Sequence, residues 1–320
     1  MLTAYPASAP AGAPQAEGKV WWIDLLDPTN EERASVERTS GLKLPSRQEL
    51  SLVESSSRVS EEDGTLFLSM PIVAQASALD EAPSPVGFVL SKDLLVTIRY
   101  TQLRSFDKVA VEFSKDDRRG GSVEAFAALV DEMIDLAADF LEAIGAELDG
   151  ISRAVFLNIR DKRSKIARSN DALRGVLIDV GNAGARLSRI REILLGLQRI
   201  VPFTFEKERD WIPRTMQGRL RTAQEDLVSL TDYETHLTDK VQFLLDAVLG
   251  FINTRQNDIF QVLTVVAVVG IPPTLVASIY GMNFKSMPEY SWPWGYQYGL
   301  AMIVLSTVLP ILWFKLRGWL

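Results

Sequence analysis

The sequence predicts an α+β domain followed by long stalk helices and two C-terminal transmembrane helices. Three features of the chain lead to this fold class. Short strand-like runs and helix-start signals alternate up to Gly120-Gly121, a long heptad pattern follows, and the chain is almost continuously apolar after Asp258. Nearly all charges lie before Asp258, so the mean hydropathy of +0.07 is an average of unlike parts.

The first part of the chain divides into a tail and a domain. Residues 1–18 are rich in Ala, Pro and Gly and lack the basic and apolar segments of a signal peptide, so we expect a disordered tail. Residues 19–121 are expected to form an α/β domain, because short β-branched and aromatic runs are bounded there by turn residues. Capping-box patterns predict helix starts at Thr29 and Ser46. The expected strands are residues 20–25, 66–73, 86–90 and 94–99.

Residues 122–257 are expected to form long helices that lead into a stalk. The expected helices are residues 122–168, residues 170–200 with an end near Pro202, and a third helix from Thr215 onward. Leu and Val recur in the third helix at spacings of three, four and seven, as in a coiled-coil seam.

The first of these helices is acidic. From Glu124 to Asp149 it carries many Asp and Glu residues and no Lys or Arg. This composition indicates either a solvated acidic helix face or a surface that concentrates cations. Both interpretations stay open at this point.

Two apolar segments are each long enough to cross the roughly 30 Å hydrocarbon core of a bilayer. We expect a first transmembrane helix at 258–281, an outer loop at 282–295, a second transmembrane helix at 296–314 and a basic tail at 315–320. Because Lys315 and Arg317 follow the second span, the positive-inside rule predicts a cytoplasmic C-terminus, and two spans then place the N-terminal region in the cytoplasm as well. A helix unbroken from residue 215 to 280 would be roughly 100 Å long and would need lateral partners, so we expect an oligomer.

Composition excludes several classes of function. The chain has no Cys and a single His, His236, which leaves no disulfide, no thiolate metal site and little basis for a Ser-His-Asp triad. No phosphate-binding loop motif occurs, and a net charge of −7 argues against a nucleic-acid partner. We therefore expect neither an enzyme nor a resident cofactor, and we interpret His236 as a solvated surface residue.

The end of the first span carries a specific motif. Residues 280–284 read YGMNF, residues 287–289 read MPE and residues 292–296 read WPWGY. This pattern resembles the signature of the CorA family of divalent-cation channels, and residues 22–25 (WIDL) resemble the family's N-terminal opening. The resemblance implies a funnel-shaped homopentamer in a bacterial inner membrane. Five first spans would line a pore for Mg²⁺ or Co²⁺, and the second spans would face lipid.

Two alternatives remain open beside Mg²⁺ transport. The related ZntB proteins transport zinc with the same architecture and commonly carry Val where Met282 lies, so Met282 and the intact MPE motif favour Mg²⁺ or Co²⁺. Lys285, however, occupies a position that is often acidic in CorA, which leaves Zn²⁺ transport open, with or without proton coupling. An alternative of another class is a membrane-anchored coiled-coil scaffold without a pore.

The resemblance assigns Gly281, Met282 and Asn283 to the selectivity filter. Mg²⁺ loses its waters reluctantly, so a pore is best suited to accept the hydrated ion. A ring of Asn283 carboxamide oxygens can accept hydrogen bonds from those waters without binding the ion too tightly to release it. Gly281 is expected to let the backbone turn.

Helical spacing traces a face of the first span below Asn283. The residues expected to line the pore are Ser278, Thr274, Ile271, Thr264, Leu263, Phe260, Asn257 and Asn253. Phe260, Leu263 and Ile271 are candidates for hydrophobic constrictions. Ordinary helix packing also favours small hydroxylated residues in membranes and is the alternative for Thr264, Thr274 and Ser278.

An acidic stripe on the stalk is a candidate regulatory metal site. Its members recur every seven residues: Glu225, Asp232, Asp239 and Asp246. In a symmetric oligomer each becomes a ring of like charges whose repulsion bound Mg²⁺ would relieve, so we expect a closed state at high internal Mg²⁺. The alternative is a solvated charge stripe that prevents wrong helix pairing.

Overall fold

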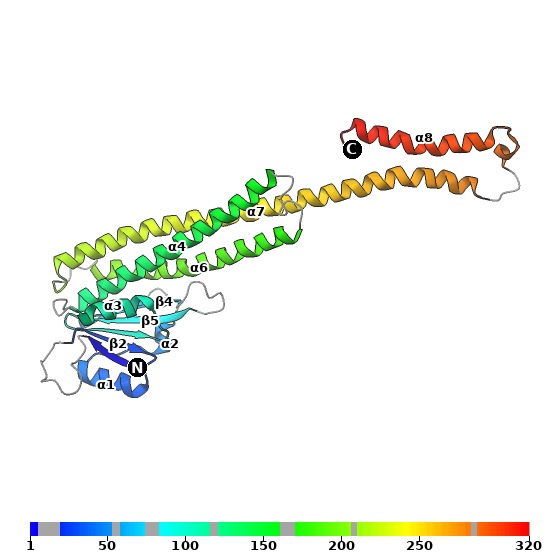
Figure 1. Cartoon of the computed structure of the whole chain (residues 1–320). Helices are drawn as coiled ribbons and strands as arrows, with labels where there is room; N and C mark the ends of the chain where they lie inside the picture. The colour runs from blue at the N-terminus through cyan, green and yellow to red at the C-terminus, as the bar shows by residue number, and fades with distance from the viewer. Residues whose placement is uncertain are drawn as a thin grey trace. The chain divides into compact units, whose positions relative to one another are not determined.

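The computed structural model describes residues 1–5, 20–52, 58–73, 83–115, 121–160, 170–205, 210–282 and 287–319. The chain forms two compact units, Met1–Leu245 and Asp246–Leu320, and helix α7 (Arg214–Tyr280) contributes to both (Figure 1). The expected α/β domain and most of the expected stalk helices thus belong to one unit. They do so because the helices complete the hydrophobic core on one face of the sheet.

The described strands of the first unit form one sheet in the order β1-β2-β6-β5-β4-β3. Strands β2 and β6 are parallel, and the other neighbouring pairs are antiparallel. The strands are β1 (Leu2–Tyr5), β2 (Trp22–Leu26), β3 (Val59–Glu62), β4 (Thr65–Ile72), β5 (Ser84–Leu90) and β6 (Leu95–Arg99). The four strands that the sequence predicts correspond to β2, β4, β5 and β6 and are confirmed.

Strands β1 and β3 were not expected. The prediction of a disordered tail is wrong for Leu2–Tyr5, which pairs with β2 so that the ring of Tyr5 stacks on Trp22 with centroids 4.5 Å apart. Residues 6–18 of that predicted tail lie outside the described residues. Strand β3 forms a hairpin with β4 through Asp63 and Gly64, whose positive φ angles of 48° and 75° are those that a two-residue hairpin turn requires.

Helices cover both faces of the sheet. Helices α1 (Asn30–Ser40) and α2 (Arg47–Leu50) begin with capping boxes at Thr29 and Ser46, so both predicted helix starts are confirmed. Their apolar residues share a small core with Val89, Val96 and Ile98 of the sheet. The other face carries α3 (Arg104–Lys115), α4 (Ser122–Arg160) and α6 (Asn170–Phe205), which share the larger core.

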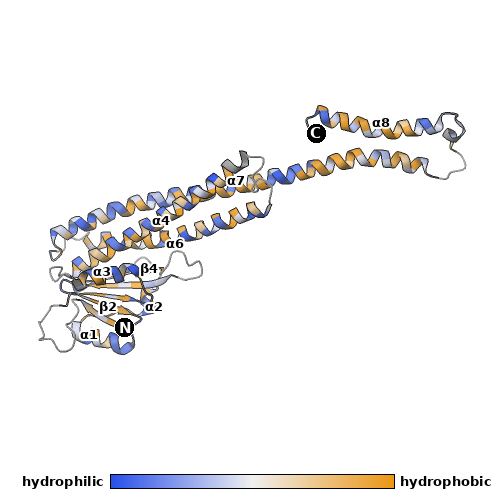
Figure 2. Ribbon diagram, viewed as in Figure 1, coloured by the Kyte–Doolittle hydropathy of each residue, from blue (hydrophilic) through white to orange (hydrophobic). Residues whose placement is uncertain are grey.

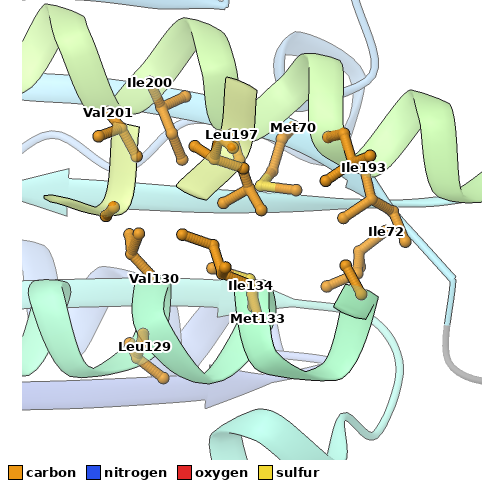
Figure 3. Close-up of a cluster of buried hydrophobic side chains, with 14 of the residues drawn as sticks. Met70, Ile72, Leu129, Val130, Met133, Ile134, Ile193, Leu197, Ile200 and Val201 are labelled. Atoms are coloured by element: carbon orange, nitrogen blue, oxygen red, sulfur yellow. The ribbon is translucent and has the colours of Figure 1, made fainter. Parts of the chain in front are cut away.

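The larger core joins the sheet to the long helices. Figure 3 shows Met70 and Ile72 of β4 beside side chains of α4 and α6 in this core. Helix α6 approaches β4 closely at Gly196, where an added Cβ would lie only 2.8 Å from the Cβ of Met70. Helix α6 also continues through Pro202 to Phe205, so the predicted end near Pro202 is wrong. The buried neighbours Ile200 and Val201 hold this last turn in the core despite the missing backbone N–H of proline.

The heptad seam of α7 is buried within the chain. Its members Leu220, Leu227, Leu237, Val241 and Leu244 pack in the core with α4 and α6. The seam therefore needs no second copy of α7 to bury it, and its pattern alone is no evidence for an oligomer.

Acidic residues of α4 pair with cations of neighbouring helices. The carboxylate of Glu132 lies 2.6 Å from Lys108 of α3, and that of Asp149 lies 2.6 Å from Lys240 of α7. The other two pairs are Asp131 with Arg219 and Glu147 with Arg186. These four carboxylates tie α4 to its neighbours, whereas Asp135, Asp139 and Glu142 are exposed, so the prediction of a solvated acidic face holds for part of the helix.

Candidate functional site

The second unit contains the two apolar helices. Helix α7 and helix α8 (Gly295–Leu316) are long and apolar enough to cross a membrane, and their apolar residues are largely exposed in the chain. Figure 2 shows the hydrophobic colour along α8 and along the part of α7 after Asp258. A short 3₁₀ helix, η2 (Pro288–Ser291), lies between them in sequence. Exposed apolar helices of this length suit a lipid environment.

The two helices face each other along a seam. On α7 the less exposed positions recur every three or four residues, at Gln261, Val265, Val269, Pro272, Val276 and Tyr280. On α8 the corresponding positions are Gly299, Ile303, Thr307, Pro310 and Phe314. Near one end the side chain of Gln261 donates a hydrogen bond to the carbonyl of Trp319, and near the other a cavity of about 580 Å³ is lined by Ala277 and Ile303 among others. The helices are therefore antiparallel.

The residues expected to line a pore lie away from this seam. All of them are exposed: Asn253, Asn257, Phe260, Leu263, Thr264, Ile271, Thr274 and Ser278. On a helix of 3.6 residues per turn, the centre of this stripe is about 150° from the centre of the seam. Within the described part of the chain, no helix covers the stripe, and Phe260 and Ile271 are each 64% exposed.

Hydroxyl groups on the stripe present acceptors. Thr264 Oγ1 donates to the carbonyl of Phe260 at 2.7 Å, and Thr274 Oγ1 donates to the carbonyl of Gly270 at 2.7 Å. Because each hydroxyl proton is bound inside the helix, the remaining lone pairs of the oxygens are available to accept hydrogen bonds from outside it. Such oxygens suit a cation or the waters around it.

Helix α7 runs without interruption through Pro272 and Pro273. Each proline lacks the N–H that would bond the carbonyl four residues earlier, so Val268 and Val269 lose their usual backbone donors. In an apolar environment such carbonyls are tolerated where they face a cavity, water or a neighbouring helix. The exposed Val268 lies near the stripe.

The predicted filter begins where α7 ends. The N–H of Gly281 still bonds the carbonyl of Ala277 at 2.9 Å, and the N–H of Met282 bonds that of Ile279 at 3.2 Å. Gly281 is not in the left-handed region, so the turn does not depend on the conformational freedom of glycine. An added Cβ would, however, lie 3.2 Å from the Ala277 carbonyl. Asn283 and Lys285 lie outside the described residues.

The acidic stripe of α7 is exposed. Glu225, Asp232, Asp239 and Asp246 all point away from the buried seam. Among the described residues, no group of three or more His, Asp or Glu side chains could hold a metal ion. Within the described part of the chain, the stripe therefore forms no complete metal site. His236 is exposed, as expected.

Sequence reasoning missed a buried polar network in the first unit. Asp24 and Arg99 are both 5% exposed, and Arg99 Nη2 donates to Asp24 Oδ2 at 2.9 Å. Thr97 Oγ1 donates to Asp24 Oδ1 at 2.7 Å and accepts from Trp22 Nε1 at 2.9 Å. The network joins β2 and β6 on the side of α3. The readable signal was one charged residue in each of two short, mostly apolar strands.

Fold and site together define a class of two-span membrane proteins. In this class a long helix follows an α+β unit, ends at a glycine-containing turn and packs against a second apolar helix. Residues 17–316 match a family model described as "CorA-like Mg2+ transporter protein". The chain belongs to the CorA family.

Curated relatives agree with this membership, and a solved structure shares the fold. The magnesium transport protein CorA of Escherichia coli strain K12 is 33% identical over 300 residues, which cover 93% of this chain and 92% of that protein. The CorA of Yersinia pseudotuberculosis is 31% identical with the same coverage. The complete structure of the CorA magnesium transporter from Methanocaldococcus jannaschii matches with a TM-score of 0.78 at 19% identity, over 100% of this chain and 99% of that one.

Proposed function

We propose that this chain is a divalent-cation transporter that conducts hydrated Mg²⁺, and the similarly hydrated Co²⁺, through a pore lined by α7. The exposed stripe of hydroxyl, amide and apolar side chains opposite the α7–α8 seam carries this proposal. A stripe of acceptor oxygens that no helix in the described part of the chain covers is suited to face copies of itself around a water-filled path. Relatives at 33% identity are named magnesium transport proteins, which supports the choice of ion.

The assembly in this proposal is a homopentamer in a bacterial inner membrane. Lys315 and Arg317 after α8 favour a cytoplasmic C-terminus, and two spans then put the first unit in the cytoplasm. The exposed apolar side chains of α8, such as Val304, Leu305 and Leu309, suit contact with lipid. The stripe on α7 would then be the pore face.

Selectivity in this proposal belongs to Gly281, Met282 and Asn283. Asn283 oxygens from several copies would accept hydrogen bonds from the first-shell waters of Mg²⁺, which the ion gives up reluctantly. Below the filter, the hydroxyl oxygens of Thr264, Thr274 and Ser278 would continue the contacts with a hydrated ion. Phe260, Leu263 and Ile271 would narrow the path and close it by excluding water.

Gating in this proposal depends on cytoplasmic Mg²⁺. The exposed carboxylates of Glu225, Asp232, Asp239 and Asp246 would meet their copies in the assembly and repel one another. Mg²⁺ bound between subunits would relieve the repulsion and hold the closed state. Within the described part of one chain, no cluster of His, Asp or Glu could bind Mg²⁺ in place of a site between subunits.

Ion flux in reconstituted vesicles tests the proposal. We expect the purified protein to carry Mg²⁺ and Co²⁺ into vesicles without a pH gradient and to carry Zn²⁺ much more slowly. Faster Zn²⁺ flux that depends on a pH gradient would favour the alternative that Lys285 leaves open. No flux of any divalent cation from a correctly assembled protein would favour the non-conducting scaffold.

A further inference from the structure

The turn that follows α8 has a defined geometry. Gly318 has a φ of 71°, the N–H of Trp319 bonds the carbonyl of Phe314 at 3.0 Å, and the N–H of Gly318 bonds that of Lys315 at 3.2 Å. These two bonds around a left-handed glycine form a Schellman motif, which stops a helix and satisfies its free carbonyls. The rings of Trp319 and Phe314 stack with centroids 5.5 Å apart, and Phe314 is 2% exposed. The turn is thus held by its backbone and by a hydrophobic contact.

This turn is bound to α7 by a side chain. Gln261 Nε2 donates to the carbonyl oxygen of Trp319 at 3.2 Å. Gln261 is half-buried on the seam, and Gln261 and Thr264 are the two polar residues between Ile259 and Val266. A polar side chain at such a position is stabilised by a hydrogen bond to a neighbouring helix. The carbonyl of Trp319, beyond the end of α8, supplies the acceptor.

The bound turn lies behind a candidate constriction. Gln261 follows Phe260 in sequence and precedes Thr264 by one turn of α7, while both of these residues lie on the exposed stripe. Thr264 Oγ1 also bonds the carbonyl of Phe260, so the three residues belong to one hydrogen-bonded turn of the helix. A displacement of Gln261 therefore moves Phe260 and Thr264 with it.

We propose that Gly318, Trp319 and Gln261 form a clamp that positions this turn of α7 against α8 and so sets how readily the pore closes at Phe260. Gln261 and Trp319 act here as positioning residues, since neither lies on the stripe. The effect on closing rests on the proposed transport function, whereas the clamp itself is a contact between two helices that can be tested without transport.

Two pairs of variants separate the clamp from general stability. Gly318→Val removes the left-handed turn, because a β-branched residue resists a positive φ, whereas Gly318→Asn tolerates it. An added Cβ at Gly318 meets nothing within 4 Å, so the two variants differ in backbone preference and not in a clash. Gln261→Leu removes the donor and leaves the turn intact, and Val262→Leu, at an exposed neighbouring position, is its control.

The contact is measured first by cross-linking. The chain contains no Cys, so Gln261→Cys with Trp319→Cys introduces the only two thiols. A short bifunctional maleimide should join them within one chain, and mass spectrometry of a protease digest then measures the yield of linked peptides, while a denaturing gel shows whether chains are joined to one another. Adding Gly318→Val should lower the yield about tenfold, and adding Gly318→Asn should leave it nearly unchanged. Equal yields with Val and Asn, or a ladder of cross-linked chains, would overturn the clamp.

The effect on closing is measured next, in assembled protein without the added thiols. We expect Gly318→Val and Gln261→Leu to shift the internal Mg²⁺ concentration that halves the flux by about fivefold, which corresponds to about 1 kcal/mol. Gly318→Asn and Val262→Leu should match the unmodified chain. Closing at the unmodified concentration in both test variants would overturn the positioning role. If no variant conducts and the unmodified chain does not either, the proposed function fails and cross-linking alone decides the clamp.

Discussion

Between Arg214 and Leu245 the apolar residues of α7 are mostly buried, whereas from Asp246 to Tyr280 they are mostly exposed. Leu227 and Leu244 have no exposed surface, while Val262 is 62% and Val266 is 64% exposed. The first part packs on α4 and α6 within one compact unit, and the second part packs along one seam with α8. One continuous helix thus contains a part whose partners lie in the same chain and a part that needs lipid or further copies.

Charge follows the same division. In the first part, Arg219 and Lys240 pair with carboxylates of α4. In the second part the sequence has no Asp, Glu, Lys or Arg between Asp258 and Lys285, and its polar groups are hydroxyls and amides. Uncharged oxygens can contact a hydrated cation without holding it strongly, so this part is suited to passage and the first part to structural stability.

The largest expected effect is on transport and comes from Asn283, which follows the second part of α7. Asn283→Ala should reduce Mg²⁺ flux in vesicles to the background of empty vesicles, because the ring of water-accepting oxygens is lost. Assembly, followed by size-exclusion chromatography in detergent, should stay unchanged. The control is Ser286→Ala in the same loop, which should conduct like the unmodified chain. Normal flux in a correctly assembled Asn283→Ala protein would mean that the motif only ends the helix.

The next effect concerns stability and lies in the first part. Leu227→Ala should lower the free energy of unfolding by about 2–5 kcal/mol, because it leaves a cavity in a fully buried core. Unfolding of the detergent-solubilised full chain, followed by circular dichroism, measures the change. The matched variant is Val266→Ala, at an exposed position of the second part, and it should change stability little. Equal losses in the two variants would contradict the division of α7.

A smaller effect is expected from the acidic stripe, which runs through both parts. The cytoplasmic region should become more resistant to protease in millimolar Mg²⁺, and Asp239→Asn with Asp246→Asn should remove most of this protection. Asp226→Asn, an exposed acid of α7 outside the stripe, is the control and should keep it. Full protection in the double variant would place Mg²⁺ sensing elsewhere in the chain.

Local signals in the sequence predicted the parts of the fold that local structure determines. The capping boxes at Thr29 and Ser46 gave the starts of α1 and α2, since the bonds that fix them span three residues. The Asp63-Gly64 hairpin carried an equally local signal that was overlooked. Strand β1 could not be predicted in this way, because Leu2–Tyr5 depends on pairing with β2, which lies 17 to 23 residues further along the chain.

The candidate site also has features that follow from local structure and features that depend on residues distant in sequence. Helical periodicity was enough to find the exposed stripe from Asn253 to Ser278, because the stripe follows from the geometry of one helix. The contact between Gln261 and Trp319 joins residues 58 positions apart. The ion pairs of α4 join it to other helices, as Asp149 and Lys240 do. Neither kind of contact follows from a spacing rule within one helix. For that reason the sequence did not show that four carboxylates between Glu124 and Asp149 pair with cations of neighbouring helices.

The smallest expected effect concerns one such ion pair of the first part. The hydrogen bond and the charge of Lys240 lower the pKa of the Asp149 carboxyl below its ordinary value of 3.8. A carboxyl whose pKa is lowered by folding stabilises the folded state above the unfolded pKa, and this contribution is lost as the pH falls through the folded pKa. Because Asp149 is exposed, solvent screens the pair and the contribution is small.

Lys240→Met should therefore lower the thermal unfolding midpoint of the solubilised chain slightly at pH 7, and the difference from the unmodified chain should disappear as the pH falls well below 3.8. The control is Asp139→Asn, an exposed acid of α4 with no ion pair in the described part of the chain, which should show no such pH-dependent difference. A difference that persists undiminished at low pH would mean that the aliphatic chain of Lys240, which is 20% exposed, stabilises the contact by packing and not by charge.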